Sequence, residues 1–222
     1  MAFFGNRYCS TINFLGFGIS LSSNCDRFYL WYFMVCSILG TGIQARLQVL
    51  HLRTLTRCRR VVAWGRSDEN LETYRQALER EGFSVATTRE AEEVAAVCNL
   101  IITATPSTSP LLRADHIRPG THITAVGSDT PQKQELDPLI LGKADLVVAD
   151  SIPQCLERGE IAKALGAGTL HEKQIVELGE IVSGRERGRT AKEQITVADL
   201  TGVAVQDIQI AKAVCAGLAV KE

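Results

Sequence analysis

The feature that most constrains the fold of this chain is a glycine turn that follows a short apolar stretch. Residues 35–39 are apolar or small, and Gly40-Thr41-Gly42 and a segment that favours helix come next. This G-x-G-x-x-A pattern, which ends at Ala45, is typical of the strand–turn–helix unit that binds a dinucleotide. Gly40 would allow the tight turn, Gly42 the close approach of a pyrophosphate, and Ala45 close helix–sheet packing. Because Gly-x-Gly also occurs in ordinary turns, the pattern alone is weak evidence.

After this turn, strand-like apolar stretches alternate with helix-like stretches. The pattern predicts a helix over 70–81 that stops at Gly82, and a shorter helix over 91–97. Pro106 and Pro110 predict a loop between two strands. Such alternation is typical of an α/β fold with a doubly wound parallel sheet, the Rossmann type. The expected strands are 35–39, 59–64, 83–86, 100–105, 121–126 and 144–149.

Three polar turns follow expected strands of this sheet. They are Gly40-Thr41-Gly42, Thr105-Pro106-Ser107 and Gly127-Ser128-Asp129. In a parallel sheet the carboxyl ends of the strands meet at one edge, where ligands of this fold bind. The convergence of three polar turns at this edge supports a dinucleotide site there.

The end of the second expected strand bears on which dinucleotide binds. An NAD site usually carries Asp or Glu there, about 20 residues after the glycines, to bind the ribose 2′-hydroxyl. Here Trp64 is followed by Gly65, and then by Arg66, Ser67 and Asp68. Arg66 and Ser67 could hold a 2′-phosphate, which favours NADP(H) over NAD(H). Two alternatives stay open: Asp68 could bind the 2′-hydroxyl, or Arg66 could be a solvated loop residue and Asp68 a helix cap.

Charge and cysteine content disfavour some classes of protein. The net charge of −1 argues against nucleic acid as the main partner, because phosphate contacts need a basic surface. The seven cysteines are scattered singly without a C-x-x-C pair, so no metal site is expected. Their spacing suits reduced thiols of a cytoplasmic protein, most of them buried. His122, within an expected strand, is expected to pack rather than to react.

Residues 1–34 differ in composition from the rest of the chain. They hold most of the aromatic residues but only three charged ones, Arg7, Asp26 and Arg27. A signal or membrane segment is disfavoured, because the apolar stretch 11–20 is short, contains two glycines and lacks a basic start. The segment is interpreted either as a hydrophobic extension that packs on a partner subunit or as a non-native start.

Several further motifs occur in order between Val35 and the C-terminus. They resemble the motifs of the ornithine cyclodeaminase/mu-crystallin family, and the tail 199–207 resembles the branch that includes proteins of ectoine utilisation. The motifs are 40–46, Thr103-Ala104-Thr105-Pro106-Ser107, 119–129, Glu135-Leu136-Asp137, 177–180, Gly188-Arg189, 195–197 and 199–207.

This resemblance implies an NAD(P)-binding domain that works with a second, substrate-binding and dimer-forming domain. Residues 35–222 would form the NAD(P)-binding domain with a C-terminal segment of the second domain, while 1–34 would be an atypical segment. Cyclodeaminases of the family pass a hydride to the cofactor, lose ammonia, close a ring and return the hydride, as from ornithine to proline. Relatives reduce cyclic imines or oxidise alanine. The expected protein is thus a homodimer that takes a small amino acid or cyclic imine.

The resemblance also implies roles for residues at matching positions. Asp129 matches the acid that donates and accepts the proton, and Ile43 and Gln44 match backbone contacts to the cofactor. Lys133 matches a residue near the site, and Leu200 with Thr201 a loop that touches cofactor and substrate. Thr105 and the strand residues 124–126 match the wall around the ribose and nicotinamide of the cofactor. The expected cofactor-binding residues are Gly40, Thr41, Gly42, Ile43, Gln44, Arg66, Ser67, Thr105, Thr124, Ala125, Val126 and Lys133.

Chemistry alone leaves two interpretations of Asp129. A carboxylate just beyond a buried strand suits a general base, whereas Asp shortly before Pro131 also suits a helix cap. The resemblance favours the catalytic role. However, the lysine and arginines with which the family holds the substrate carboxylate have no counterpart in 1–34, and a site without them loses positioning. The chain is therefore either an NAD(P)-dependent enzyme or a truncated, non-catalytic NADP(H)-binding protein resembling mu-crystallin.

Overall fold

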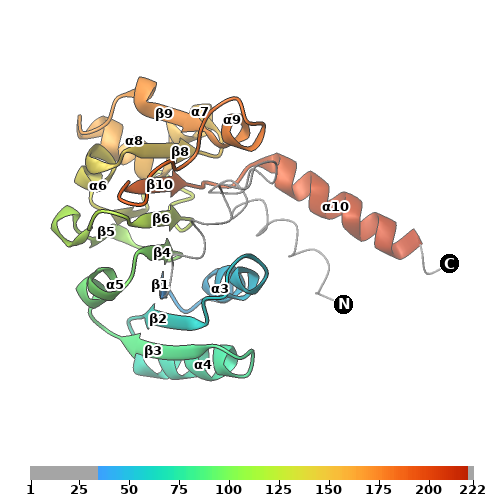
Figure 1. Ribbon diagram of the computed structural model, residues 1–222. Coiled ribbons are helices and arrows are strands. Elements are labelled where there is room, and N and C mark those ends of the chain that lie inside the picture. Colours follow the sequence, from blue (N-terminus) through green and yellow to red (C-terminus); the bar gives the residue numbers. More distant parts are fainter. Residues whose placement is uncertain (1–34, 220–222) are drawn as a thin grey trace.

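A parallel sheet of eight strands organises residues 35–219, the part of the chain that the computed structural model describes (Figure 1). The strand order is β3–β2–β1–β4–β6–β10–β8–β9. The prediction of a doubly wound α/β fold is confirmed. The strands are β1 (Cys36–Leu39), β2 (Arg60–Trp64), β3 (Ser84–Thr88), β4 (Leu100–Thr103), β6 (His122–Ala125), β8 (Leu146–Ala149), β9 (Ile175–Glu177) and β10 (Thr196–Asp199).

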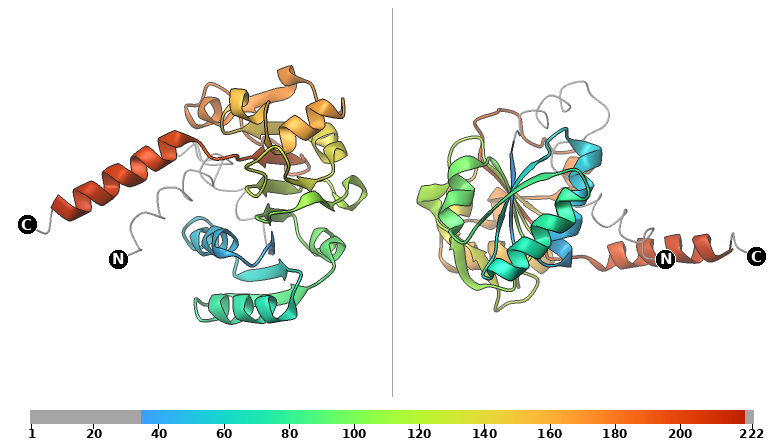
Figure 2. Two further views of the ribbon diagram at one scale, coloured as in Figure 1. Left: turned by 180° about the vertical axis from the view of Figure 1, so that it is seen from behind. Right: turned by 90° about the horizontal axis from the view of Figure 1, so that it is seen from below.

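Helices cover both faces of this sheet. In Figures 1 and 2, α5, α6 and α8 lie on one face and α3 lies on the opposite face. Because both faces are covered, β1, β4, β6 and β10 are buried along their whole length. The helices are α3 (Ile43–Leu55), α4 (Asp68–Glu79), α5 (Ala91–Val97), α6 (Pro138–Lys143), α7 (Ile152–Cys155), α8 (Gly159–Gly166), α9 (Leu178–Val182) and α10 (Ala204–Ala219), with short 3₁₀ turns η1 (Ala114–His116) and η2 (Glu172–Gln174).

The C-terminal part of the chain divides between the sheet and a projecting helix. Strand β10, which the sequence patterns did not predict, lies between β6 and β8. Its first residue, Thr196, contacts Nδ1 of His122 through its hydroxyl at 2.7 Å, and Thr124 contacts Nε2 at 3.0 Å. Burial lowers the pKa of His122 to about 3, so this histidine packs as expected. Helix α10 then leaves the sheet (Figures 1 and 2).

The prediction of a loop around Pro106 and Pro110 is wrong for Pro110. Strand β5 (Thr108–Leu112) contains Pro110 and pairs with β7 (Gln134–Leu136) in a small separate sheet. Proline lacks an N–H and is normally confined to edge strands and irregularities. Here the register shifts between Thr108 and Leu112, so Pro110 lies where the regular pairing is interrupted.

The described cysteines are free, and four of the five are buried. Burial raises the pKa of the Cys36 thiol well above its ordinary value, so this side chain behaves as a small neutral hydrophobe. The expectation of buried single thiols is confirmed for Cys36, Cys58, Cys98 and Cys155, whereas Cys215 is exposed. Among residues 35–219, none of the helices has the length and apolar content that crossing a membrane needs.

Candidate functional site

Gly40 occupies a backbone position at the switch point of the sheet that only glycine fits. Its φ is +121°, and a Cβ built there would lie 2.6 Å from the carbonyl oxygen of Ala104. The Gly40 N–H donates to the carbonyl of Trp64 at 3.0 Å. The turn is therefore fixed between β2 and β4, on either side of β1, where a doubly wound sheet binds its ligand.

Gly42, in contrast, faces open space at the start of α3. A Cβ built on Gly42 would meet no described atom within 4 Å, and its φ of −79° is ordinary. Packing of the protein therefore does not require glycine at this position. The helix starts without a side-chain cap among the described residues, and both Ile43 and Gln44 are exposed. An open helix N-terminus of this kind can accept a pyrophosphate on its backbone N–H groups.

The loop after β2 lies beside this glycine turn. A Cβ on Gly65 would lie 2.9 Å from Cγ2 of Thr41, so the two turns are in contact. Arg66 is exposed, and Ser67 caps α4 by accepting a hydrogen bond from Asn70 N at 3.4 Å. The helix cap is thus Ser67 and not Asp68, which was one interpretation of the sequence. The Asp68 carboxylate, 84% exposed, lies 3.4 Å from Arg89.

The loops after β4 and β6 meet next to the glycine turn. Thr105 is buried, and its N–H and hydroxyl both donate to Glu135 Oε1 at 2.7 Å. Thr124 and Ala125 are buried within β6, and Val126, half-buried, donates from its N–H to Thr103 at 2.9 Å. These residues therefore lie at the carboxyl edge of the sheet, and the Thr105 hydroxyl is engaged by Glu135.

Asp129 and Lys133 form an ion pair in the turn after β6. Lys133 Nζ donates to Asp129 Oδ1 at 2.5 Å, and the Asp129 side chain is 53% exposed. The residues from Gly127 to Lys133 form turns rather than a helix, so the alternative of a helix cap near Pro131 is wrong. Although Asp129 follows a buried strand, its side chain is therefore accessible from solvent.

Leu200 and Thr201 follow β10 at the same edge, but their side chains pack against or hydrogen-bond to other residues of the protein. Leu200 is buried in a small core cluster with Leu178 and Ile181. The Thr201 hydroxyl donates to Asp150 Oδ1 at 3.2 Å and accepts from Gln154 at 2.6 Å. A contact of these residues with a ligand would therefore come mainly from their backbone.

Three buried carboxyl groups under this edge were not identified from the sequence. Glu135 of β7, Glu160 of α8 and Asp199 of β10 are each at most 1% exposed. Burial raises the pKa of Glu135, raises that of Glu160 to about 7 and raises that of Asp199 well above its ordinary value. An acidic residue beside apolar residues, as in Glu135-Leu136 and Glu160-Ile161, is the signal that could have revealed the first two.

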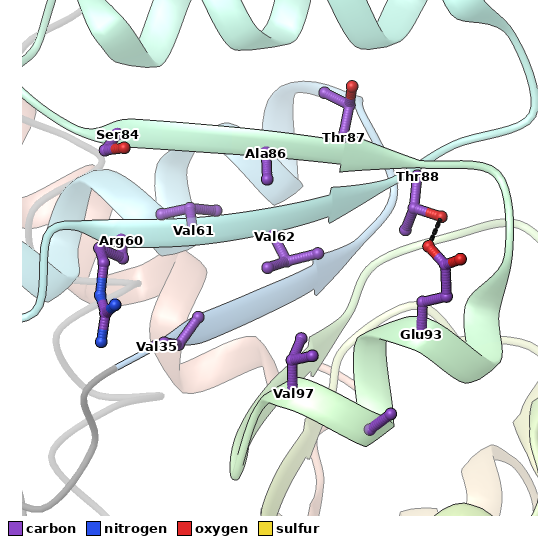
Figure 3. Close-up of a pocket in the computed structure, with 11 residues that line it drawn as sticks. Val35, Arg60, Val61, Val62, Ser84, Ala86, Thr87, Thr88, Glu93 and Val97 are labelled. Carbon is purple, nitrogen blue, oxygen red and sulfur yellow. Dashed lines mark hydrogen bonds between the residues drawn. The ribbon is translucent and has the colours of Figure 1, made fainter.

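A separate apolar groove lies over β2 and β3, on the side of α5 (Figure 3). It has a volume of about 480 Å³, and Val35, Val62 and Val97 contribute to its lining. At one end the Thr88 hydroxyl donates to Glu93 at 2.6 Å. None of the expected site residues lines this groove, so it is distinct from the candidate site at the carboxyl edge.

Comparison with known protein families identifies the family of this chain. The sequence profile of the ornithine cyclodeaminase/mu-crystallin family matches residues 34–221. The chain belongs to this family. Within the family, an alanine dehydrogenase of Archaeoglobus fulgidus is 38% identical over 181 residues, which cover 81% of this chain and 55% of that protein.

Solved structures of family members share the fold. The structure of an archaeal alanine dehydrogenase dimer with bound NAD matches with a TM-score of 0.84 and 33% identity, over 96% of this chain and 65% of that chain. The iminosuccinate reductase of Paracoccus denitrificans in complex with NAD⁺ matches with a TM-score of 0.77 and 30% identity, over 94% and 61%. The present chain spans about half the length of the curated relatives that it matches.

Proposed function

We propose that residues 35–219 form the nicotinamide-dinucleotide-binding part of an enzyme that acts on the nitrogen-bearing carbon of a small amino acid or its imine. The observation that carries this proposal is the open start of α3 at Gly42, next to a Gly40 turn that only glycine can form. Alanine oxidation, imine reduction and ornithine cyclodeamination are the candidate reactions, since relatives carry the first two activities in their names.

In this proposal the dinucleotide supplies the hydride acceptor or donor, and the chain supplies position and a proton. The backbone N–H groups of Ile43 and Gln44 bind the pyrophosphate. Thr105 and Val126 line the ribose and nicotinamide. The Asp129 carboxylate exchanges a proton with the nitrogen-bearing centre, and Lys133 keeps that carboxylate oriented through their 2.5 Å ion pair.

The assembly around this part is also a proposal. Helix α10 projects from the sheet, and we assign it to the dimer-forming domain that the family resemblance implies. The dimeric state of the archaeal alanine dehydrogenase supports a homodimer. The free, buried cysteines fit a reducing compartment such as the cytoplasm.

Replacing Gly42 with alanine tests the proposal directly. We expect Gly42→Ala to weaken NADH binding at least tenfold, about 1.4 kcal/mol, because the new methyl group occupies space that the pyrophosphate needs. The fold should not change, since a Cβ at this position meets no described atom. The measurement is a fluorescence titration with NADH and NADPH, alongside thermal unfolding.

Gly166→Ala is the matched control for this experiment. Gly166 lies within α8, and a Cβ there also meets no described atom within 4 Å. Gly166→Ala should therefore bind NADH as the unchanged chain does. Equal affinities for all three proteins would show that no dinucleotide approaches Gly42, and the proposal would be rejected.

The choice between NADP(H) and NAD(H) is proposed to depend on Arg66. With Asp68 lying near Arg89 and Ser67 capping α4, Arg66 is the exposed group that can meet a 2′-phosphate. Arg66→Ala should weaken NADPH binding about tenfold and NADH binding less than twofold. Arg80→Ala, at the other end of α4, should change neither dissociation constant. If NADH binds more tightly than NADPH to the unchanged chain, the preference for NADP(H) is wrong.

The alternative is a nucleotide-binding protein without turnover. It is favoured by the exposure of Asp129, which a catalytic carboxylate inside a closed site would not show. This alternative expects NADPH or NADH binding together with no consumption of cofactor. The two functions are thus separated by assaying turnover on protein that has first been shown to bind.

A further inference from the structure

Two buried carboxylates hold the loop that carries Asp129 at both of its ends. Burying a carboxylate is unfavourable unless hydrogen-bond donors surround it. The donors around each buried carboxylate therefore identify the segments of the chain that it connects. Glu135 lies at the end of the loop 127–135, in β7, and Glu160 reaches the same place from α8. Both side chains are at most 1% exposed.

Glu135 joins the loop to the end of β4. Its Oε2 accepts from Gly127 N at 3.0 Å and from the Thr103 hydroxyl at 2.8 Å. Its Oε1 accepts from both Thr105 donors at 2.7 Å. A Cβ on Gly127 would lie 2.3 Å from this carboxylate, so glycine is needed for the close approach. Gly127, the first residue of the loop, is therefore hydrogen-bonded to the side chain of Glu135, its last residue.

Glu160 accepts hydrogen bonds from three residues at the two ends of the loop. Its Oε1 accepts a short hydrogen bond from the hydroxyl of Ser128, the residue just before Asp129. The same oxygen accepts from Glu135 N at 2.7 Å, and Oε2 accepts from Leu136 N at 3.0 Å. Glu160, which follows Leu136 by 24 residues in the sequence, thus contacts both sides of the loop at once from helix α8.

We propose that Glu160 is a positioning residue that holds the 127–135 loop through Ser128 and thereby places the Asp129 carboxylate for proton transfer. The proposal rests on the function proposed above. Asp129 is exposed, and its ion pair with Lys133 lies within the same loop, so that pair cannot fix the loop to the sheet. The link from Ser128 to Glu160 provides the anchor to α8.

The state of Glu160 should change near neutral pH. Its pKa is raised to about 7, mainly by burial and opposed by its three hydrogen bonds. The acidic groups that interact with it electrostatically are Glu135 from β7 and Asp199 from β10, and Asp199 in turn interacts with Asp150 after β8. Protonation of Glu160 turns its charge-assisted hydrogen bonds into weaker neutral ones, so its hold on Ser128 and on the N–H groups of Glu135 and Leu136 weakens. The loop should therefore loosen as the pH falls through about 7.

Hydrogen exchange and kinetics on the full chain test this role with matched variants. Ser128→Ala removes one hydroxyl, and Glu160→Gln keeps the size of the side chain. In both, amide exchange in 127–136, corrected for intrinsic rates, should rise at least tenfold at pH 8, whereas wild type should show the rise only towards pH 6. Ser128→Ala should lower kcat about tenfold and leave the NADH dissociation constant within threefold. Glu157→Gln, an exposed change in the turn before α8, should match wild type.

The outcomes separate this inference from the proposed function. If Ser128→Ala and Glu160→Gln exchange and turn over like Glu157→Gln, the positioning role is rejected, whatever binds to the chain. If the loop loosens but kcat keeps its wild-type value and pH profile, Glu160 is only structural and the inference is again rejected. A chain that binds neither NADH nor NADPH rejects the proposed function, while hydrogen exchange still decides whether Glu160 holds the loop.

Discussion

Gly40→Ala is expected to lower the free energy of unfolding by about 2–6 kcal/mol, because it combines backbone strain with crowding. A non-glycine residue at φ of +121° costs about 1–3 kcal/mol in backbone strain. The added Cβ would also lie 2.6 Å from the Ala104 carbonyl oxygen, and crowding of this kind adds about 1–3 kcal/mol.

The neighbouring backbone has little freedom to relieve this contact. Ala104 N donates to the Leu39 carbonyl at 2.8 Å, and Thr105 N is held by Glu135 at 2.7 Å. Moving the Ala104 oxygen away would disturb both bonds and the pairing of β1 with β4. The strain therefore remains in the folded state.

Urea unfolding of Gly40→Ala and Gly82→Ala measures the two contributions separately. Gly82 also has a positive φ, +86°, but a Cβ there meets no described atom within 4 Å. Gly82→Ala should cost only the backbone strain, about 1–3 kcal/mol. If the two variants lose the same stability, the crowding against Ala104 contributes nothing and the explanation of Gly40 is wrong.

The sequence predicted the parts of the fold that depend on local patterns. Strands β1, β2 and β4 are short apolar runs bounded by turn residues, and α5 was predicted with its observed bounds. Strand β10 was missed because Thr196 and Asp199 make it look polar. The Thr196 hydroxyl contacts His122, and Asp199 Oδ2 accepts from Ile161 N, and both partners are distant in sequence. A sequence pattern contains no record of such partners.

The candidate site divides in the same way. The turn at Gly40 and the start of α3 after Gly42 follow from the spacing of the glycines, because backbone conformation and helix start are local properties. The bond from Ser128 to Glu160 spans 32 residues and exists only after α8 has packed on β7. The exposure of Asp129 likewise depends on what lies over the edge of the sheet, which the loop sequence does not encode.

Asp129→Asn is expected to lower kcat at least 100-fold while leaving the NADH dissociation constant within threefold. Asparagine keeps the shape of the side chain but does not exchange a proton, and general acid–base catalysis is commonly worth 10²–10⁴-fold in rate, as an order of magnitude. Stability should hardly change, because Asp129 is 53% exposed and an exposed ion pair with Lys133 contributes roughly 0–1 kcal/mol. Initial rates with pyruvate plus ammonia and with cyclic imines, at saturating reduced cofactor, measure the effect.

Two further variants test whether the loss of kcat is specific to the Asp129 carboxylate. Asp115→Asn changes an exposed aspartate in η1, before β6 rather than after it, and should leave kcat unchanged. Lys133→Met removes the ion-pair partner without removing the proton carrier, so its kcat should fall between those of wild type and Asp129→Asn. If Asp129→Asn turns over at the wild-type rate, another group carries the proton. If wild type binds NADH but consumes none with any substrate, the chain is the non-catalytic binder.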